Sequence, residues 1–407
     1  MKIRTLFVTL FLGMLLSACG AGVLQLANGG IGGTGISAGT ITAFGSIFVN
    51  GVEYEVDQAT FTRNGLMAGG QGEYNIGEYV TVKGTVNPDG ITGTATEVAF
   101  SSELNGAVTG ASTDGVNIRV LGQAVRTNAL TVLSGFKQLT DLLAGNVVEV
   151  SGVRDAQGVL VASSIRLEQG NYLPGDTQEL KGPILQVDTQ RSTVLIGGLT
   201  VDYSGAALLG FTASAPEVGQ YVRVRSVQAV AGAQLVASEL ELQSADWQFE
   251  EGEKLELEGV ITRFVSINDF AVNGVPVVVN ADTRFEHGSA SQLALNALVE
   301  VDGQINASGA IVAEEVSIKE SISSGIDELS GAITAINPSA QEFTLAGVTI
   351  IVDSSTIWED ESVYGVRQMN FTYLQMGDFV EADVKPLDNG KLLALRIKRE
   401  DGEDEDD

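Results

Sequence analysis

Short runs in which apolar and polar residues alternate recur along the chain from about residue 37 onward, and this alternation is typical of β-strands. In the run 235–242 it predicts one buried face and one solvent-exposed face. Glycine-containing turns separate the runs, and Asn50-Gly51 and Asn273-Gly274 are typical of tight two-residue hairpins. The pattern therefore predicts an all-β protein.

The same order of predicted strands occurs five times along the chain. Each copy opens with a strand that has a glycine near its start, and successive opening glycines are 67, 76, 77 and 72 residues apart. A nearly constant period of this kind indicates tandem repeats of one small fold. The opening glycines are Gly39, Gly106, Gly182, Gly259 and Gly331.

Within each copy the first strand is followed by a hairpin, an irregular connector, a fourth strand such as 77–84 and a fifth strand such as 160–167. In two copies the connector has leucines at helical spacing, which predicts one short helix there. These leucines are Leu139, Leu142 and Leu143 in one copy and Leu293, Leu295 and Leu298 in the other.

Three strands, a helix and two further strands form the order of an OB-like barrel, which closes a five-stranded sheet and removes its exposed edges. We therefore expect a tandem array of about five small OB-like five-stranded β-barrels with short connecting helices. A small β-sandwich or a continuous β-array is the alternative. The expected barrels cover residues 37–102, 103–170, 178–244, 254–320 and 327–399.

The N-terminal segment has the parts of a secretory signal peptide. Lys2 and Arg4 supply positive charge, residues 6–16 form an apolar run, and small residues follow. The apolar run is shorter than the roughly 20 residues that span a bilayer. We therefore expect residues 1–18 to be a signal peptide.

The end of this segment resembles the bacterial lipobox, in which a cysteine is acylated and becomes the new N-terminus. The residues that carry the resemblance are Leu16, Ser17, Ala18 and Cys19. Because two or three acyl chains give stable anchoring, we expect a lipid bilayer to hold the protein through acylated Cys19. A glycine-rich tether at 19–36 would follow. An ordinary signal peptide that happens to end in a cysteine is the alternative.

Gly20 follows the cysteine. By resemblance to enterobacterial sorting rules, an aspartate at that position would retain a lipoprotein in the inner membrane. We therefore expect a lipid-anchored protein of the cell envelope, in the outer membrane and on either its periplasmic or its surface face.

The composition narrows the classes of function. The 407 residues include one cysteine and one histidine. If Cys19 is acylated, no thiol remains for disulfides or zinc–cysteine sites, and stability must come from apolar cores. The 52 acidic and 23 basic residues give a formal charge of −29, which repels phosphate backbones and argues against nucleic-acid binding. Solubility beside a membrane explains this charge, and attraction of cations is the sharper alternative.

Three features match known sites without the context that those sites need. Residues 30–35 have the spacing of a dinucleotide-binding loop, but neither a preceding strand nor a following helix is predicted. His287 has no Gly-x-Ser-x-Gly nucleophile motif beside it and is predicted to be a solvated turn residue, and a multi-histidine metal centre is excluded by count. The tail 400–407 lacks the spacing of a calcium loop and is expected to be acidic and disordered.

Carboxylates and aromatic side chains leave two further possibilities. Most acidic residues fall on the polar faces of strands or in linkers such as 246–253, and no pair is recognisable as a general acid and base. Aromatic residues would stack on sugars or peptides if they shared an exposed face, while core packing explains them equally well. Tyr79 and Tyr221 occupy the same position of the fourth strand in the first and third copies. The others are Tyr54, Tyr203, Trp358 and Tyr373.

The first copies resemble the bacterial lipoprotein family known as domain of unknown function 5666. The resemblance lies in Gly32-Gly33-Thr34-Gly35, the segment 39–51 that follows, and 77–84. Copies three to five keep the strand framework but depart from the Phe44-Gly45-Ser46 segment. The resemblance implies a fold and a location and brings no activity.

These observations predict a non-catalytic envelope lipoprotein, which acts as a binding or scaffolding module for an envelope protein or a polysaccharide, without a cofactor. Repetition of a small fold suits multivalent surfaces. The first alternative is a carbohydrate-binding or polysaccharide-processing protein, since OB-like barrels present grooves to oligosaccharides. The second is a surface protein that binds divalent cations.

Overall fold

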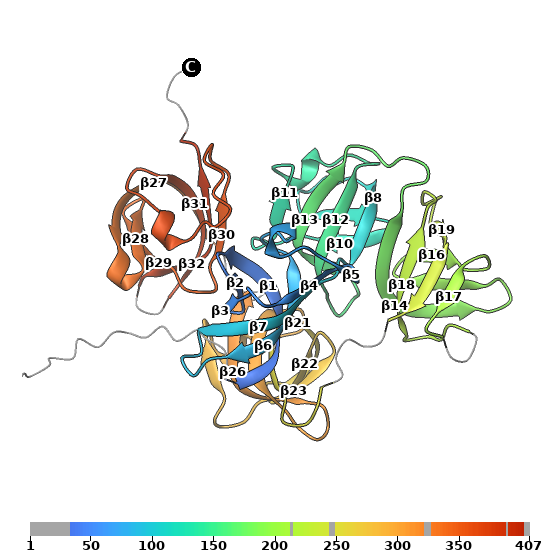
Figure 1. The fold of residues 1–407 in the computed structure, drawn as a ribbon, viewed down its shortest axis with the longest axis horizontal. Helices are drawn as coiled ribbons and strands as arrows, with labels where there is room; N and C mark the ends of the chain where they lie inside the picture. The colour runs from blue at the N-terminus through green and yellow to red at the C-terminus, as the bar shows by residue number, and fades with distance from the viewer. Residues whose placement is uncertain (1–32, 212–214, 244–248, 321–326, 388–389, 403–407) are drawn as a thin grey trace, which may run out of the picture.

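A computed structural model describes residues 33–211, 215–243, 249–320, 327–387 and 390–402. The expectation of an all-β chain of closed five-stranded barrels is confirmed (Figure 1). The helices within the described residues are three-residue 3₁₀ turns, so the short connecting helix is a single turn. In that part of the chain, no helix has the length and apolarity needed to cross a membrane.

Repeat 1 shows how a barrel closes. It contains β1 (Gly33–Phe44), β2 (Ile47–Val49), β3 (Val52–Glu55), β4 (Thr60–Arg63), β5 (Leu66–Met67), η1 (Gln71–Glu73), β6 (Tyr79–Val86) and β7 (Thr92–Phe100). Strands β1, β2 and β3 pair antiparallel, β3 pairs parallel with β7, and β6 pairs with both β7 and β1. The hairpin β2–β3 turns at Asn50 and Gly51, whose φ angles of 51° and 76° match the expected tight turn.

The other repeats follow the same plan. Repeat 2 contains β8 (Leu104–Gly110), β9 (Asn117–Val120), β10 (Gln123–Arg126), β11 (Val132–Ser134), η2 (Leu139–Asp141), β12 (Val147–Arg154) and β13 (Leu160–Gln169). Repeat 3 contains β14 (Gln178–Asp188), β15 (Thr193–Ile196), β16 (Leu199–Asp202), β17 (Ala207–Leu209), β18 (Tyr221–Ser226), β19 (Gln234–Val236) and β20 (Glu239–Leu242). Its fifth strand is thus divided into β19 and β20.

Repeat 4 contains β21 (Lys254–Ser266), β22 (Asp269–Val272), β23 (Val275–Val278), β24 (Arg284–Glu286), η3 (Ala290–Gln292), β25 (Leu298–Ile305) and β26 (Ile311–Glu320). Repeat 5 contains β27 (Asp327–Asn337), η4 (Pro338–Ala340), β28 (Glu342–Leu345), β29 (Val348–Ile351), β30 (Ile357–Asp360), η5 (Phe371–Tyr373), β31 (Phe379–Pro386) and β32 (Leu392–Glu400). Strand β1 begins at Gly33, inside the segment expected to be a tether.

Apart from β5, which only repeat 1 has among the described residues, each repeat has one short strand that the sequence pattern did not predict. This strand lies in the connector and pairs parallel with the last strand of its repeat. In repeat 1, for example, β7 pairs first with β3 and then, further along its length, with β4. The connector strands are β4, β11, β17, β24 and β30. They have three or four residues each, too few for alternation to distinguish them from a loop.

The repeats are not packed in chain order, and repeat 1 lies at the centre of the molecule (Figure 1). The N-terminal half of β1 pairs parallel with β21, which joins repeats 1 and 4 in one sheet. Gly35 permits this approach, because a Cβ atom there would lie 2.5 Å from the backbone oxygen of Lys254. Repeats 2 and 3 are joined through β8 and β14.

The apolar cores follow these contacts. Repeats 2 and 3 share one continuous core, whereas repeats 1, 4 and 5 each have their own. Two alanines of β1 leave their own barrel, since Ala38 packs into the core of repeat 4 and Ala43 into that of repeat 5. Strand β1 therefore contributes to three barrels.

Candidate functional site

The residues expected to anchor the protein lie outside the described part of the chain. These are Leu16, Ser17, Ala18 and Cys19, together with most of the expected tether. Of the dinucleotide-like segment 30–35, the described portion from Gly33 belongs to β1 and pairs with β6. A strand at this position lacks the helix N-terminus on which a phosphate loop depends.

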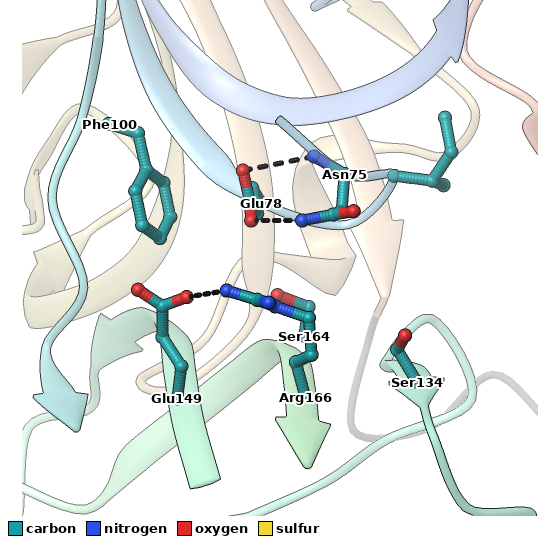
Figure 2. A pocket seen from close by; sticks show the side chains of 8 residues that line it. Asn75, Glu78, Phe100, Ser134, Glu149, Ser164 and Arg166 are labelled. Carbon is teal, nitrogen blue, oxygen red and sulfur yellow. Dashed lines mark hydrogen bonds and ion pairs between the residues drawn. The ribbon is translucent and has the colours of Figure 1, made fainter. Parts of the chain in front are cut away.

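The junctions between barrels hold the buried polar side chains that are candidates for a site. One junction joins repeats 1 and 2 and encloses a cavity of about 10 Å³. A volume of this size holds about one water molecule. Figure 2 shows the side chains that line it, which are Asn75, Ile76, Glu78 and Phe100 of repeat 1 and Ser134, Glu149, Ser164 and Arg166 of repeat 2.

Arg63, on β4, ties the two repeats together. Its guanidinium donates two hydrogen bonds of 2.9 Å to Glu78 and one of 2.5 Å to Glu149, and it lies 4.2 Å from the ring centroid of Phe100. Arg166 donates to Glu149 from within repeat 2 at 2.5 Å (Figure 2). Burial alone would lower the pKa of Arg63, but the bonds and charges of the two glutamates outweigh it and raise that pKa.

The approach of the two barrels depends on Gly77, which precedes Glu78. Gly77 has a φ of 84°, and a Cβ atom there would lie 2.6 Å from Cβ of Val132 in repeat 2. The next residue but one, Tyr79, donates its backbone N–H to Oγ of Ser151 at 2.8 Å. Repeat 4 has Asn296 at the corresponding position, and its side chain bonds to residues 156 and 157 of repeat 2.

The second junction covers the outer face of repeat 4 with repeats 1 and 5. Strand pairing sets Glu256 beside Asp302, Asp302 beside Glu315, and Glu258 beside Glu300. We call these five residues the carboxylate face. All except Glu258 are less than 10% exposed. These carboxylates lie at the polar positions of their strands, as the sequence predicts, but neighbouring repeats cover them.

Repeats 1 and 5 supply the cover of this face. From repeat 1, Thr40 donates to Glu258 at 2.5 Å and Tyr54 donates to Glu256 at 3.3 Å. A second cavity of about 10 Å³ lies between the three repeats. Its lining residues are Asn50, Gly51, Glu300, Asp302, Glu315, Ser317, Lys319 and Ser355.

His287 lies at the edge of this junction rather than in solvent, so its prediction as a solvated turn residue was wrong. Its side chain is 10% exposed, and its Nε2 atom lies 3.3 Å from Asp353 of repeat 5. Its Nδ1 atom bonds to Oγ of Ser317 at 2.9 Å. Burial alone would raise the pKa of Asp353, but the bond and charge of His287 help to lower it to about 2.

Lys385 of repeat 5 also crosses this junction. Its ammonium donates to the backbone oxygens of His287 at 3.3 Å and Ile318 at 2.9 Å. Burial, with the nearby charge of Lys319, lowers the pKa of Lys385 to about 7. Lys319 itself pairs with Glu300 at 2.5 Å, and this charge raises its pKa despite burial.

Repeat 5 reaches repeat 1 through Arg367. The guanidinium lies 4.4 Å from the ring centroid of Phe44 and donates to three backbone oxygens of repeat 1, those of Gln71, Gly72 and Tyr74, at 2.5–2.9 Å. A cation over an aromatic face with several backbone acceptors makes a specific contact. Repeat 1 therefore contacts repeats 2, 4 and 5.

The aromatic residues do not gather in one open groove. Tyr54, Tyr203 and Trp358 are buried, Tyr79 and Tyr221 are half-buried, and Tyr373 is 39% exposed. The two tyrosines at the same repeat position both bridge barrels. Tyr79 donates to the backbone oxygen of Glu258 at 2.7 Å, and Tyr221 donates to Glu103 of repeat 2 at 2.5 Å.

The two cavities limit the chemistry that these junctions can perform. Each is far smaller than the 300–1,000 Å³ of ordinary ligand pockets. Within the described ranges, no group of three or more His, Cys, Asp and Glu side chains is placed to hold a metal ion. Neither cavity therefore has room for an ordinary small-molecule ligand.

Sequence reasoning missed these junction residues. Glu149 and Asp302 lie at polar positions of alternating strands, and Arg63 lies on a short strand that was not predicted. For Asp302, the sequence signal was a pair of carboxylates at successive outward positions in each of the segments 254–258 and 298–302. Arg63 and Glu149 had no such signal.

A search of curated proteins finds no match. Among solved structures, the chain titled "drosophila Unr CSD456" is similar, with 12% sequence identity over 74% of this chain and 97% of that chain and a TM-score of 0.14.

The family model "Domain of unknown function (DUF5666)" matches residues 36–99, 105–166, 181–241, 258–317 and 330–398. The five matches follow the five barrels and cover well over half of the chain. The resemblance seen in the first copies thus extends to copies three to five. The chain belongs to the DUF5666 family and carries five tandem copies of its domain.

Proposed function

We propose that this chain is a non-catalytic lipoprotein of the cell envelope, anchored through acylated Cys19, whose five barrels act as one binding or scaffolding block. The observation that carries this proposal is the set of junctions between barrels, both neighbouring and distant in sequence. Arg63 with Glu149 and Arg367 with repeat 1 are contacts that separate, freely jointed repeats would lack. A block of this kind offers one fixed arrangement of outer loops to a partner.

The carbohydrate alternative has less support. Its main argument was a groove lined by aromatic side chains, and Tyr54, Tyr203 and Trp358 are buried instead. The divalent-cation alternative has carboxylates in close proximity, but they lie in a covered junction rather than on an open surface. An envelope protein is therefore the partner that we expect first.

Metabolic labelling with a radioactive fatty acid tests the anchor. We expect label in the wild-type protein and none in the Cys19→Ala variant, with the wild type recovered in the membrane fraction. Ser17→Ala is a matched control that keeps the cysteine and should retain the label. Unlabelled wild-type protein would contradict the anchoring.

A pull-down from detergent-solubilised envelopes tests the binding role. The lipidated protein and the soluble Cys19→Ala form are used side by side, with Arg63→Ala as a variant whose first junction is broken. We expect the same envelope protein with both intact forms and less of it with the variant. Retention of polysaccharide instead would favour the carbohydrate alternative, and recovery of neither would contradict the proposal.

A further inference from the structure

The carboxylate face carries more negative charge than its surroundings balance. Besides its own five carboxylates, Glu286 of β24 and Asp353 of repeat 5 face the same junction. The other charged and titratable groups packed around it are fewer, and they comprise four cations, one histidine and one tyrosine. They are Lys254, Arg284, His287 and Lys319 of repeat 4, Lys385 of repeat 5 and Tyr54 of repeat 1.

Strand pairing fixes the like charges next to one another. Glu256 and Asp302 are register partners on β21 and β25, and Asp302 and Glu315 are partners on β25 and β26. Side chains at such positions have Cβ atoms about 4.5–5.5 Å apart, and like charges there are destabilising. The carboxylates cannot separate without breaking the sheet of repeat 4.

Asp302 is the least satisfied member of the face. The residue is 4% exposed and lines the cavity shared with Ser355 of repeat 5. Its buried Oδ1 atom has no hydrogen-bond partner among the described residues. A buried carboxylate without partners is costly, whereas its protonated form is neutral and can donate a hydrogen bond.

Repeat 5 is the part of the cover that side-chain packing, rather than strand pairing, holds in place. Its six strands pair only with each other within the described residues, whereas repeat 4 is joined to repeat 1 by the pairing of β21 with β1. Repeat 5 rests on repeat 4 through side chains such as Lys385 and Asp353, and on repeat 1 through Arg367, whose contact an open state would give up. Removing repeat 5 would return water to the side of the carboxylate face that borders Ser355, where Asp302 lines the shared cavity, and Glu256 is the register partner of Asp302.

We propose that the contact between repeats 4 and 5 is a proton-dependent latch, which is closed while Glu256 and Asp302 hold protons and opens when they lose them. Closure removes water from adjacent carboxylates, and proton uptake removes the resulting repulsion. Opening restores the water and lets the same groups ionise. The device goes beyond the proposed binding role, because it would make the place of repeat 5 in the block depend on pH, and it can be tested without a binding partner.

The direction of the effect follows from linkage. Burial and the neighbouring carboxylates raise the pKa of Asp302 well above its usual range, and burial is the main cause that raises the pKa of Glu256 to about 8. The closed state therefore binds more protons than the open state above about pH 4.5, so closure weakens as the pH rises. Lys385, with its pKa lowered to about 7, acts in the opposite direction only above pH 7. The clearest window is pH 5 to 7.

Distance measurement between spin labels on the full-length soluble form tests the latch. The labels are placed on Ala307→Cys in repeat 4 and Ser339→Cys in repeat 5, both exposed positions, in the Cys19→Ala background. We expect a single distance population at pH 5 and a growing population of longer distances at pH 7. Each proton released raises the ratio of open to closed molecules about tenfold per pH unit.

The paired variant Glu256→Gln with Asp302→Asn removes the titration while keeping the shapes, and its distances should not change between pH 5 and 7. Asp302→Asn alone serves if the paired variant does not fold. Glu314→Gln is the matched control, since Glu314 is exposed on the same strand as Glu315, and it should behave as the wild type. A wild-type distance that is constant with pH, or a paired variant that still opens, would overturn the proposal. Closure by millimolar calcium at pH 7 would also overturn it, because a bound cation would then replace the protons.

Discussion

The junction of repeats 1 and 2 and the junction around repeat 4 both bury charge, but they balance it differently. In the first, Arg63 and Arg166 bond directly to Glu78 and Glu149. In the second, Asp302 lies between two other carboxylates in register. Paired charges specify one geometry at any moderate pH, whereas adjacent like charges make a contact depend on protons. Barrels of one fold thus form a contact that does not depend on pH in one place and a contact that does in another.

Removing Arg63 breaks the balanced junction most severely. Arg63→Ala leaves Glu78 and Glu149 without their shared partner, with side chains only 4% and 5% exposed. Loss of one member of a buried ion pair costs about 3–5 kcal/mol. We expect a decrease of this size in the free energy of unfolding, measured by urea denaturation of the soluble form.

Arg191→Ala is the control for this change. Arg191 pairs with Asp188, but its side chain is 82% exposed. Exposed pairs of this kind contribute about 0–1 kcal/mol. Equal losses in the two variants would mean that the junction of repeats 1 and 2 does not form as described.

A single methyl group at Gly77 tests the close approach of the same two barrels. Gly77→Ala places a Cβ atom 2.6 Å from Val132 at a φ of 84°, whereas Gly219→Ala in repeat 3 has a φ of 90° and no atom within 4 Å. Both variants carry the cost of a left-handed backbone, about 1–2 kcal/mol. We expect Gly77→Ala to lose about 1–3 kcal/mol more, the usual cost of overpacking, in the same denaturation experiment. Identical losses would contradict the contact.

The two tyrosines that bridge barrels donate to different kinds of acceptor, a neutral backbone oxygen for Tyr79 and a carboxylate for Tyr221. Tyr221→Phe removes the hydrogen bond to the carboxylate of Glu103, and Tyr79→Phe removes the one to a backbone oxygen. Hydrogen bonds to charged groups contribute about 1.5–3 kcal/mol and neutral ones about 0.5–1.5 kcal/mol. We expect the larger loss of unfolding free energy for Tyr221→Phe, and the reverse order would count against the assigned partners.

The smallest effect is expected at Asn296, the contact of repeat 4 with repeat 2. Asn296→Gly removes hydrogen bonds at an exposed site but also relieves a non-glycine φ of 69°. Because the two terms oppose each other, we expect a change within about 0.5 kcal/mol. Urea denaturation of Asn296→Gly, with Gly219→Ala measured in parallel, checks this. A large loss of unfolding free energy would show that the contact is more buried than the structure indicates.

The strands and hairpins could be predicted because their signals are local. Alternation marks runs such as Tyr79–Val86, and Asn273 with Gly274 adopts the left-handed turn that its sequence favours. The order of five strands then points to a closed barrel, and the family comparison agrees. Short strands such as β11 were not predicted, because three residues are too few to show alternation of apolar and polar positions.

The packing of one barrel on another could not be predicted in the same way. Glu149 is an ordinary polar residue between valines, and only its meeting with Arg63, 86 positions away, makes it a junction residue. His287 was expected in solvent because its partner, Asp353, lies in another repeat and no residue near His287 in the sequence indicates that pairing. Such contacts depend on a few side chains from distant repeats, and a single sequence does not relate these to each other.

The pairing of β1 with β21 has a consequence for the order in which the molecule is completed. Thr40 and Glu258, which meet at this join, are 218 positions apart. At 5–20 residues per second, a ribosome needs about 10–40 s to add that much chain. Through this interval the outer edge of β1 stays unpaired, and an open strand edge is a template for wrong partners. The barrel that is synthesised first can close on its own strands, but its outer edge is covered only after β21 of the fourth repeat has been made.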